Sequence, residues 1–279
     1  MQNHTITNGI VRLHVTTYGN PTAAPVILLH GFPDTADCWA QVAALIAQQC
    51  YVIVPDGRGI HRSDAPSEIS AYAIDSLVAD VFAIADALVP HRTFILVGHD
   101  WGGVVAWAAV SLQPGRIARA LLCNAPHPAI FLDALNHDTA QQHASRYISA
   151  LRSEGFEERF AQNDYEIALG AFASVPLTAH QKDALRAAWA RPGRIRGALN
   201  WYRAATFAIT GGTCDIPIPD GSIPIELLWG AHDGSLLVSL AERHLQSLPW
   251  ISLTVLPDAN HWLPRTHPSE IASRILQKH

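Results

Sequence analysis

The sequence has little cysteine: four residues in a chain of 279, spaced far apart at Cys38, Cys50, Cys123 and Cys214. None forms a CxxC pair, and none has a histidine at the spacing of a metal site. This distribution argues against a disulfide framework and against a zinc site. We therefore expect four reduced thiols in the protein core.

The sequence also lacks a cluster of positive charge and a long apolar run. Charged residues make up 15% of the chain, the formal net charge is −5, and the lysines and arginines are scattered, so nucleic acid is not an expected partner. No stretch reaches the roughly 18 uninterrupted apolar residues that a membrane span requires. Residues 1–15 lack both the basic and the apolar region of a signal peptide. We therefore expect a soluble, cytoplasmic protein with no membrane partner.

What the sequence does contain is a series of short apolar runs, rich in Val, Ile and Leu. Such near-continuous runs are typical of parallel strands buried on both faces. Between the second and third run, apolar residues recur at helical spacing from Ile74 to Leu88, which predicts a crossover helix. Strands that alternate with helices predict an open α/β sheet. The runs are residues 26–31, 51–56, 94–99, 118–123, 225–230 and 253–257.

The strand pattern is interrupted once, between residues 130 and 220, where the sequence indicates helices. Thr178 and Gln181 have the spacing of a capping box before a helix that runs towards Arg191. The stretch PIPDGSIP, residues 217–224, is typical of a linker that returns to the sheet. We therefore predict a core domain of residues 1–129 and 221–279, and a helical cap domain of residues 130–220.

The segment GHDWGG follows the run 94–99 directly and precedes an Ala-rich apolar stretch. In a nucleophile elbow, a strained turn between strand and helix raises one side chain above the sheet, and small residues are needed two positions to either side. Gly98 and Gly102 meet this need around Asp100. A carboxylate in that position can attack an electrophilic carbon and form an ester. The alternative is a Gly-rich turn whose Asp caps the next helix.

Two further residues fit a nucleophile at Asp100. Asp233 follows the run 225–230, and His261 follows the run 253–257, which gives the order nucleophile, acid, histidine expected of a hydrolase of this kind. Taken singly, Asp233 is equally well explained as a turn residue or helix cap. His261 could be a surface histidine, since the chain contains 15 histidines. Their order and their positions at strand ends favour a catalytic triad.

The loop after the first run supplies a fourth element, His30-Gly31-Phe32-Pro33. In a nucleophile-elbow hydrolase, a backbone N–H from such a loop and the N–H after the nucleophile form an oxyanion hole. The candidates are the amides of Phe32 and Trp101. Without this context the loop would be an ordinary turn held by Gly and Pro.

Together the segments HGFPD, PDGRGIHRSDAPS, GHDWGG, WGAHD and NHW resemble the epoxide hydrolase branch of the α/β-hydrolase fold superfamily, over nearly the whole chain. The resemblance implies a mostly parallel central sheet flanked by helices, with the helical cap inserted before the strand that carries the acid. One departure is His61, which stands where the RGxG segment of the family usually has a second Gly. Histidine tolerates left-handed backbone angles better than most residues, so the loop can keep its course.

The resemblance also implies two cap tyrosines that hold the epoxide oxygen. Asn200-Trp201-Tyr202-Arg203 matches the later of the two family motifs, and Arg146-Tyr147-Ile148 resembles the earlier one. Tyr165 is the second candidate for the earlier position. A phenol with an ordinary pKa near 10 can donate a hydrogen bond or a proton to the alkoxide that forms when an epoxide opens. The other explanation is that each tyrosine is a packing residue of an amphipathic helix.

The expected reaction is hydrolysis of a small apolar epoxide to a vicinal diol, with water as the second substrate. Asp100 would form a hydroxyalkyl ester while Tyr147 and Tyr202 hold the oxygen, and His261, oriented by Asp233, would activate the water. The resemblance implies no metal and no organic cofactor. A homodimer remains open.

Two other functions remain open on the sequence alone. A haloalkane or haloacid dehalogenase would use the same Asp-His-Asp triad. Its halide would be held by Trp101 and by a second donor, either an Asn where this chain has Phe32 or a cap tryptophan at Trp189 or Trp201. Fluoroacetate dehalogenases have Arg in the place of Trp101. A hydrolase fold retained only for ligand binding is the remaining alternative.

Overall fold

Eight strands form one sheet within residues 1–277, the part of the chain that the computed structural model describes. Their order in the sheet is β1-β2-β4-β3-β5-β6-β7-β8. β2 is antiparallel to both of its neighbours, and the remaining pairs are parallel. The strands are β1 (Gln2–Asn8), β2 (Val11–Tyr18), β3 (Ala24–Leu29), β4 (Cys50–Pro55), β5 (Phe94–His99), β6 (Ile117–Cys123), β7 (Ile225–Gly230) and β8 (Ser252–Leu256).

All six predicted apolar runs are strands, with ends displaced by two residues at most. The crossover helix is α2 (Ile74–Leu88), with the predicted bounds. The prediction did not include β1 and β2. Their signal is the alternation of Val11, Leu13 and Val15, which are buried while the residues between them are not, as in a half-buried strand.

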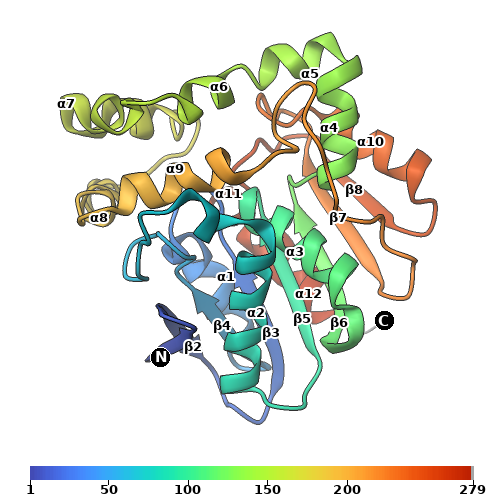
Figure 1. Ribbon diagram of the computed structural model, residues 1–279. Helices are drawn as coiled ribbons and strands as arrows, with labels where there is room; N and C mark the ends of the chain where they lie inside the picture. The colour runs from blue at the N-terminus through green and yellow to red at the C-terminus, as the bar shows by residue number, and fades with distance from the viewer. Residues whose placement is uncertain (278–279) are drawn as a thin grey trace.

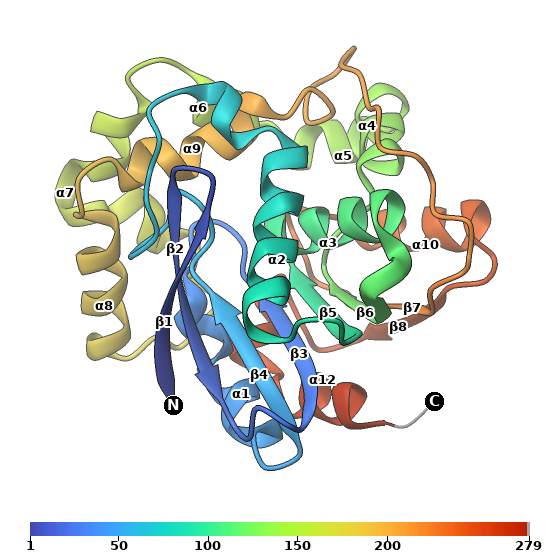
Figure 2. The same ribbon diagram turned by 60° about the horizontal axis from the view of Figure 1, so that its bottom comes forward.

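Helices cover both faces of the sheet (Figure 2). Because successive strand residues point to opposite faces, Ile27 and Leu29 pack with α2 and α3 (Trp101–Leu112), whereas Val26 and Leu28 pack with α1 (Ala40–Ile46) and α12 (Pro268–Leu276). Each fully buried aliphatic side chain contributes about 1.5–3 kcal/mol to folding. The sheet between these layers is therefore a rigid base for loops at its edge.

The segment between β6 and β7 lies within the described residues and contains six helices and no strand. Figure 1 shows these helices across the upper part of the view. The predicted capping box of Thr178 and Gln181 is present at the start of α8, and the stretch 217–224 is irregular, as expected. The helices are α4 (Pro128–His137), α5 (Thr139–Ala144), α6 (Tyr147–Arg152), α7 (Phe156–Gly170), α8 (Ala179–Trp189) and α9 (Arg194–Ala204).

Helix α7 has an interruption that the sequence did not predict. Asn163, Asp164 and Tyr165 have positive φ angles of 48°, 55° and 64°, so the helix is divided into two pieces by a left-handed turn without glycine. Cys214 also differs from the expectation. It is only half-buried and lies in the irregular chain after α9, while the other three thiols are buried.

The remaining helices, α10 (Val238–Ser247) and α11 (Leu263–Thr266), precede and follow β8. Across residues 1–277, no helix is both long enough and apolar enough to cross a membrane.

Candidate active site

Asp100 lies at the turn between β5 and α3, with φ of 52° and ψ of −122°. A non-glycine residue in this region is strained, and such strain is held only where the surroundings determine it. A Cβ atom at Gly98 would lie 2.4 Å from the Gly102 carbonyl oxygen, and one at Gly102 would lie 2.2 Å from the carbonyl oxygen of Leu29. The turn therefore has the geometry and the steric demands of a nucleophile elbow.

The Asp100 carboxylate is nearly enclosed, with 8% of the residue exposed. Its Oδ1 accepts a hydrogen bond of 2.8 Å from the Phe32 amide. Burial raises the pKa of Asp100, and this rise is opposed by the charge of His261 and by the amides of Trp101 and Phe32. The two predicted oxyanion-hole amides therefore both act on this carboxylate.

The loop that carries Phe32 is held close to the nucleophile. A Cβ atom at Gly31 would lie 2.2 Å from Asp100 Oδ1, so only glycine fits there. His30 donates from Nδ1 to the Gly31 carbonyl at 3.0 Å and accepts at Nε2 from the Gly57 amide at 3.1 Å. The Phe32–Pro33 peptide bond is cis. The predicted segment from His30 to Pro33 thus forms one wall of the site.

His261 lies between the two aspartates. Its Nδ1 is 2.7 Å from Asp233 Oδ2, and its Nε2 is 3.8 Å from Asp100 Oδ2. Burial by itself lowers the pKa of His261, but the charge of Asp233, the hydrogen bond with it and the charge of Asp100 raise that pKa to about 9. The structure therefore brings the three residues of the predicted triad together in the expected order.

Asp233 is held by a residue that the sequence reasoning missed. Asn124 donates from Nδ2 to Asp233 Oδ2 at 2.7 Å and accepts at Oδ1 from the Gly230 amide at 3.1 Å. The amides of Ser235 and Leu236 donate to Asp233 Oδ1 at 2.8 and 2.9 Å. The signal available in the sequence was the position of Asn124, directly after a strand like the other site residues.

His99 fixes the backbone of the loop that carries His261. Its Nε2 donates to the His261 carbonyl at 2.8 Å. Burial holds the pKa of His99 well below its ordinary value, so the ring is neutral and carries its proton on the donating Nε2. The histidine of the GHDWGG segment thus connects the elbow to the loop after β8.

Tyr147 and Tyr202 come together near Asp100 from different helices. Their ring centroids are 6.5 Å apart, and both residues line one cavity with Asp100 and His261. Burial raises the pKa of both phenols, and the charge of Asp100 raises both further; a hydrogen bond from the Trp101 side chain partly opposes the rise at Tyr202. Tyr202 is buried, whereas Tyr147 keeps 37% of its surface exposed, part of it as cavity wall.

Tyr165, the other candidate, packs elsewhere. It lies on the interrupted part of α7 against Phe160 and Trp189, and it does not line the cavity that contains Asp100. The geometry therefore favours Tyr147 as the partner of Tyr202.

The cavity has a volume of about 490 Å³. Apart from the four groups named above, its walls are mostly apolar and come from both the core and the helical segment. Its other lining residues are Phe32, Pro33, Ala150, Leu151, Phe156, Arg159, Phe160, Ile167, Ala168, Ala171, Ser235 and Trp262. A small apolar molecule can therefore reach Asp100 under the tyrosines.

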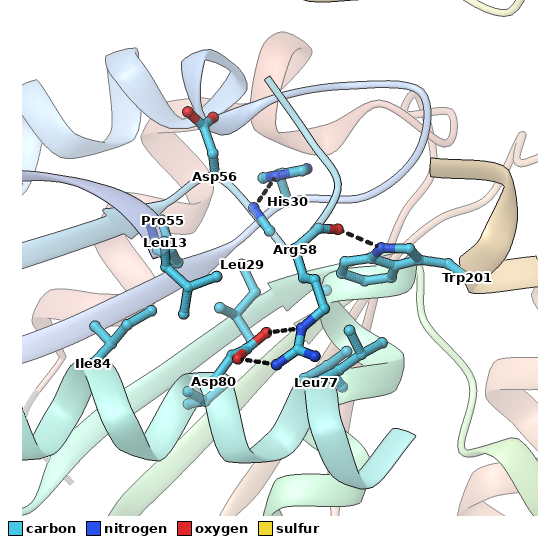
Figure 3. Close-up of a pocket in the computed structure, with 14 residues that line it drawn as sticks. Leu13, Leu29, His30, Pro55, Asp56, Arg58, Leu77, Asp80, Ile84 and Trp201 are labelled. Atoms are coloured by element: carbon cyan, nitrogen blue, oxygen red, sulfur yellow. Dashed lines mark hydrogen bonds and ion pairs between the residues drawn. The ribbon is translucent and has the colours of Figure 1, made fainter. Parts of the chain in front are cut away.

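A second cavity, of about 30 Å³, is lined in part by His30 (Figure 3). Arg58 crosses it and pairs with buried Asp80 through contacts of 2.9 and 2.6 Å, and the Arg58 carbonyl accepts the Trp201 indole N–H at 2.8 Å. This space is too small for anything larger than a water molecule, so it is not a substrate site. We infer that the residues around it hold the loops of the candidate active site in place. Nearby, His61 has φ of 44° and so adopts the left-handed conformation expected from the sequence.

The hydrogen bonds of two tryptophans in the helical segment make the dehalogenase alternative less favourable. The indole N–H of Trp189 donates to the Pro33 carbonyl at 2.8 Å, and that of Trp201 donates to Arg58, as above. Both tryptophans that could have served beside Trp101 as the second halide donor therefore already donate to backbone carbonyls.

Comparison with known proteins identifies the family of the chain. The model of the alpha/beta hydrolase fold family matches residues 24–268. AB hydrolase superfamily protein YfhM of Bacillus subtilis is 31% identical, covering 97% of this chain and 95% of its own length. Epoxide hydrolase A of Mycobacterium tuberculosis is 30% identical, covering 97% and 94%. A solved structure of epoxide hydrolases from metagenomes of hot environments is 27% identical, with a TM-score of 0.87 over 100% of this chain and 99% of that one. The chain thus belongs to the alpha/beta hydrolase fold family, in which it is similar to epoxide hydrolases.

Proposed function

We propose that this hydrolase opens small apolar epoxides to vicinal diols through an ester formed on Asp100. One observation supports the proposal above all. A carboxylate on a nucleophile elbow, Asp100, and two tyrosines line the same mostly apolar cavity. A serine hydrolase has no need of the tyrosines, whereas an epoxide needs both a nucleophile for carbon and donors for oxygen.

In the first half-reaction, Asp100 attacks the less hindered epoxide carbon with Oδ2, because Oδ1 is held by the Phe32 amide. The carbon–oxygen bond breaks, and the oxygen receives hydrogen bonds and a proton from the phenols of Tyr147 and Tyr202. The raised pKa of each phenol keeps it protonated at neutral pH, so both are present as donors.

In the second half-reaction, a change of charge prepares the base. Ester formation removes the negative charge of Asp100, which is one of the charges that raise the pKa of His261. The pKa of His261 therefore falls, the ring gives its proton to the phenolate left by the first step, and the neutral ring can then take a proton from water. The water attacks the ester carbonyl, and the resulting oxyanion lies between the amides of Phe32 and Trp101. Collapse of this intermediate breaks the ester bond, the departing oxygen takes the proton of the new carboxyl group, and the diol leaves with Asp100 again a carboxylate and His261 protonated. Asp233, fixed by Asn124 and two amides, keeps the His261 ring oriented.

The helical segment is part of this proposal. We assign residues 130–220 as a cap domain on a core of residues 1–129 and 221–279, because α6 and α9 carry the two tyrosines and α7 supplies apolar walls of the cavity. The dehalogenase alternative is less well supported, because the indole N–H groups of Trp189 and Trp201 are already bonded. A role in ligand binding alone leaves the complete set of nucleophile, base and acid unexplained.

Trapping of the ester tests the mechanism. With His261→Gln and styrene oxide, intact-protein mass spectrometry should show one adduct, and peptide mapping should place it on Asp100. The matched Asp100→Ala variant should show none. An unmodified Asp100 in the His261→Gln variant under saturating epoxide would point to direct attack by water instead.

Turnover of two substrates side by side separates epoxide hydrolysis from dehalogenation. The unmodified protein should convert styrene oxide to its diol and release no bromide from a short bromoalkane. Bromide release without diol formation would identify a dehalogenase.

A further inference from the structure

The two helices that carry the tyrosines are joined by a reciprocal pair of arginine contacts. Arg152, the last residue of α6, donates from Nη1 to the Tyr202 carbonyl and, at 2.9 Å, to the Ala205 carbonyl at the end of α9. Arg203, in α9, donates from Nη2 to the Ser153 carbonyl at 3.0 Å, directly after α6. Each helix therefore contributes an arginine that binds the backbone at the end of the other.

The two arginines differ in what else they bind. Arg203 also forms a two-point ion pair with Glu157, at 2.6 and 2.9 Å, and this contact lowers the pKa of that carboxyl. Among the described residues, Arg152 has no carboxylate within 4.0 Å. Burial lowers its pKa, and its guanidinium is used on backbone carbonyls at the end of a helix, where such groups lack helical partners.

The contacts lie close to the tyrosines in the chain but outside the cavity. Arg152 donates to the carbonyl of Tyr202 itself, and Tyr147 is the first residue of the six-residue helix that Arg152 ends. A helix this short is not stable alone, so its position depends on tertiary contacts. Both arginines line a separate surface groove with Glu154 and Glu157, and neither lines the cavity of Asp100.

We propose that Arg152 and Arg203 are positioning residues for the first half-reaction. They hold α6 against α9 so that the hydroxyl groups of Tyr147 and Tyr202 reach the same epoxide oxygen. The inference rests on the proposed function, because it gives the tyrosines a shared oxygen to hold. It places control of epoxide opening at two side chains that touch neither the substrate nor the nucleophile.

The test separates the two half-reactions in the full-length protein. Arg152→Gln should slow ester formation from styrene oxide roughly 10- to 100-fold, the range in which small displacements of catalytic groups act. The rate constant of ester hydrolysis should stay unchanged, because Asp233 and His261 are held elsewhere. The matched control is Arg146→Gln, since Arg146 is exposed and contacts only His143; it should leave both rates unchanged.

A double-mutant cycle distinguishes positioning from general loss of structure. In a Tyr202→Phe background, Arg152→Gln should slow ester formation less than it does in the wild type, because one of the two hydroxyl groups that it brings together is gone. Arg152→Lys, which keeps a charge and a donor, should recover part of the rate. Arg203→Lys keeps the charge opposite Glu157 but loses the planar fork. This variant provides a second test if Arg152→Gln does not fold. It should slow ester formation and leave ester hydrolysis unchanged.

Three outcomes overturn the inference. The first is equal slowing of both half-reactions, and the second is full additivity of Arg152→Gln with Tyr202→Phe. The third is a wild-type rate of ester formation in both arginine variants. If the unmodified protein itself forms no ester from any epoxide, the proposed function fails and the inference fails with it, which is a different result from a normal wild type with unaffected variants.

Discussion

The candidate site has two parts that are carried by different regions of the chain. The strand-end triad consists of Asp100, Asp233 and His261, which follow β5, β7 and β8. The tyrosine pair consists of Tyr147 and Tyr202, which lie on helices between β6 and β7. Backbone amides and buried partners such as Asn124 hold the triad. Arginine side chains that reach helix-end carbonyls hold the tyrosine pair. The proposed nucleophile is thus fixed by the register of a sheet, and the two tyrosines by contacts that single side chains provide. Substitutions near the triad should abolish chemistry, while those near the pair should reduce it by degrees.

The largest effect is expected at the nucleophile. Asp100→Ala should reduce diol formation by about 10⁴-fold or more, because no other group on the elbow can form the ester. Since burial raises the pKa of this carboxyl, the fold disfavours its charged form, so Asp100→Asn, which removes the charge and tolerates the φ of 52° better than Ala does, should not lower the melting temperature at pH 7. Steady-state assays and thermal unfolding check both parts, and a loss of several degrees would contradict the second.

Removal of one phenol should have a smaller effect. Tyr147→Phe and Tyr202→Phe should each slow ester formation by about 10²-fold, the lower range for loss of a positioned acid, and leave ester hydrolysis unchanged. Pre-steady-state mass spectrometry measures the two rates separately. Tyr165→Phe is the matched control, because Tyr165 lies outside the cavity; slowing by this variant comparable to that of Tyr147→Phe would reverse our choice between them.

Asn124→Ala should destabilise the fold around Asp233, because Asn124 is one of the residues that hold this carboxylate in place. The change removes one of the donors to the buried Asp233 carboxylate and leaves the Gly230 amide without its acceptor, so we expect a loss of about 2–4 kcal/mol in the free energy of unfolding. Asn124 also has φ of 43°, which Ala tolerates poorly. Asn124→Gly removes the same contacts without that strain. Denaturant unfolding should therefore find the Gly variant the more stable of the two, and the opposite order would refute the strain argument.

The smallest effect, a change of a few degrees in melting temperature, should come from pH. The pKa of His261 is raised from 6.5 to about 9, so its protonated form stabilises the fold fully below pH 6.5, and this stabilisation is lost as pH rises through about 9. The melting temperature of the wild type relative to His261→Gln should fall across this window. Tyr147→Phe should not alter the trend, because the pKa of that phenol is raised above its ordinary value of 10. A flat difference would show that His261 stays neutral.

The same division separates what the sequence could predict from what it could not. The six apolar runs, the helix from Ile74 to Leu88 and the glycines around Asp100 are local patterns, so the strand-end part of the site followed from them. The support from Asn124 and the contacts of Arg152 join residues far apart in the chain and leave no periodic signal. The left-handed turn at residues 163–165 contains no glycine, and its only signal in the sequence was Asn163-Asp164, two residue types that adopt left-handed angles more often than most but also occur within helices.

The position of the helical segment in the sheet order has a consequence for how such proteins diverge. β6 and β7 are direct neighbours, with Ala120 paired to Ile225, so everything between them is a single crossover connection. The pairing of the two strands is independent of the length and content of that connection. Recombination at two points in a gene can therefore replace the whole tyrosine-bearing stretch and give the lineage a new substrate range, while the triad is inherited unchanged.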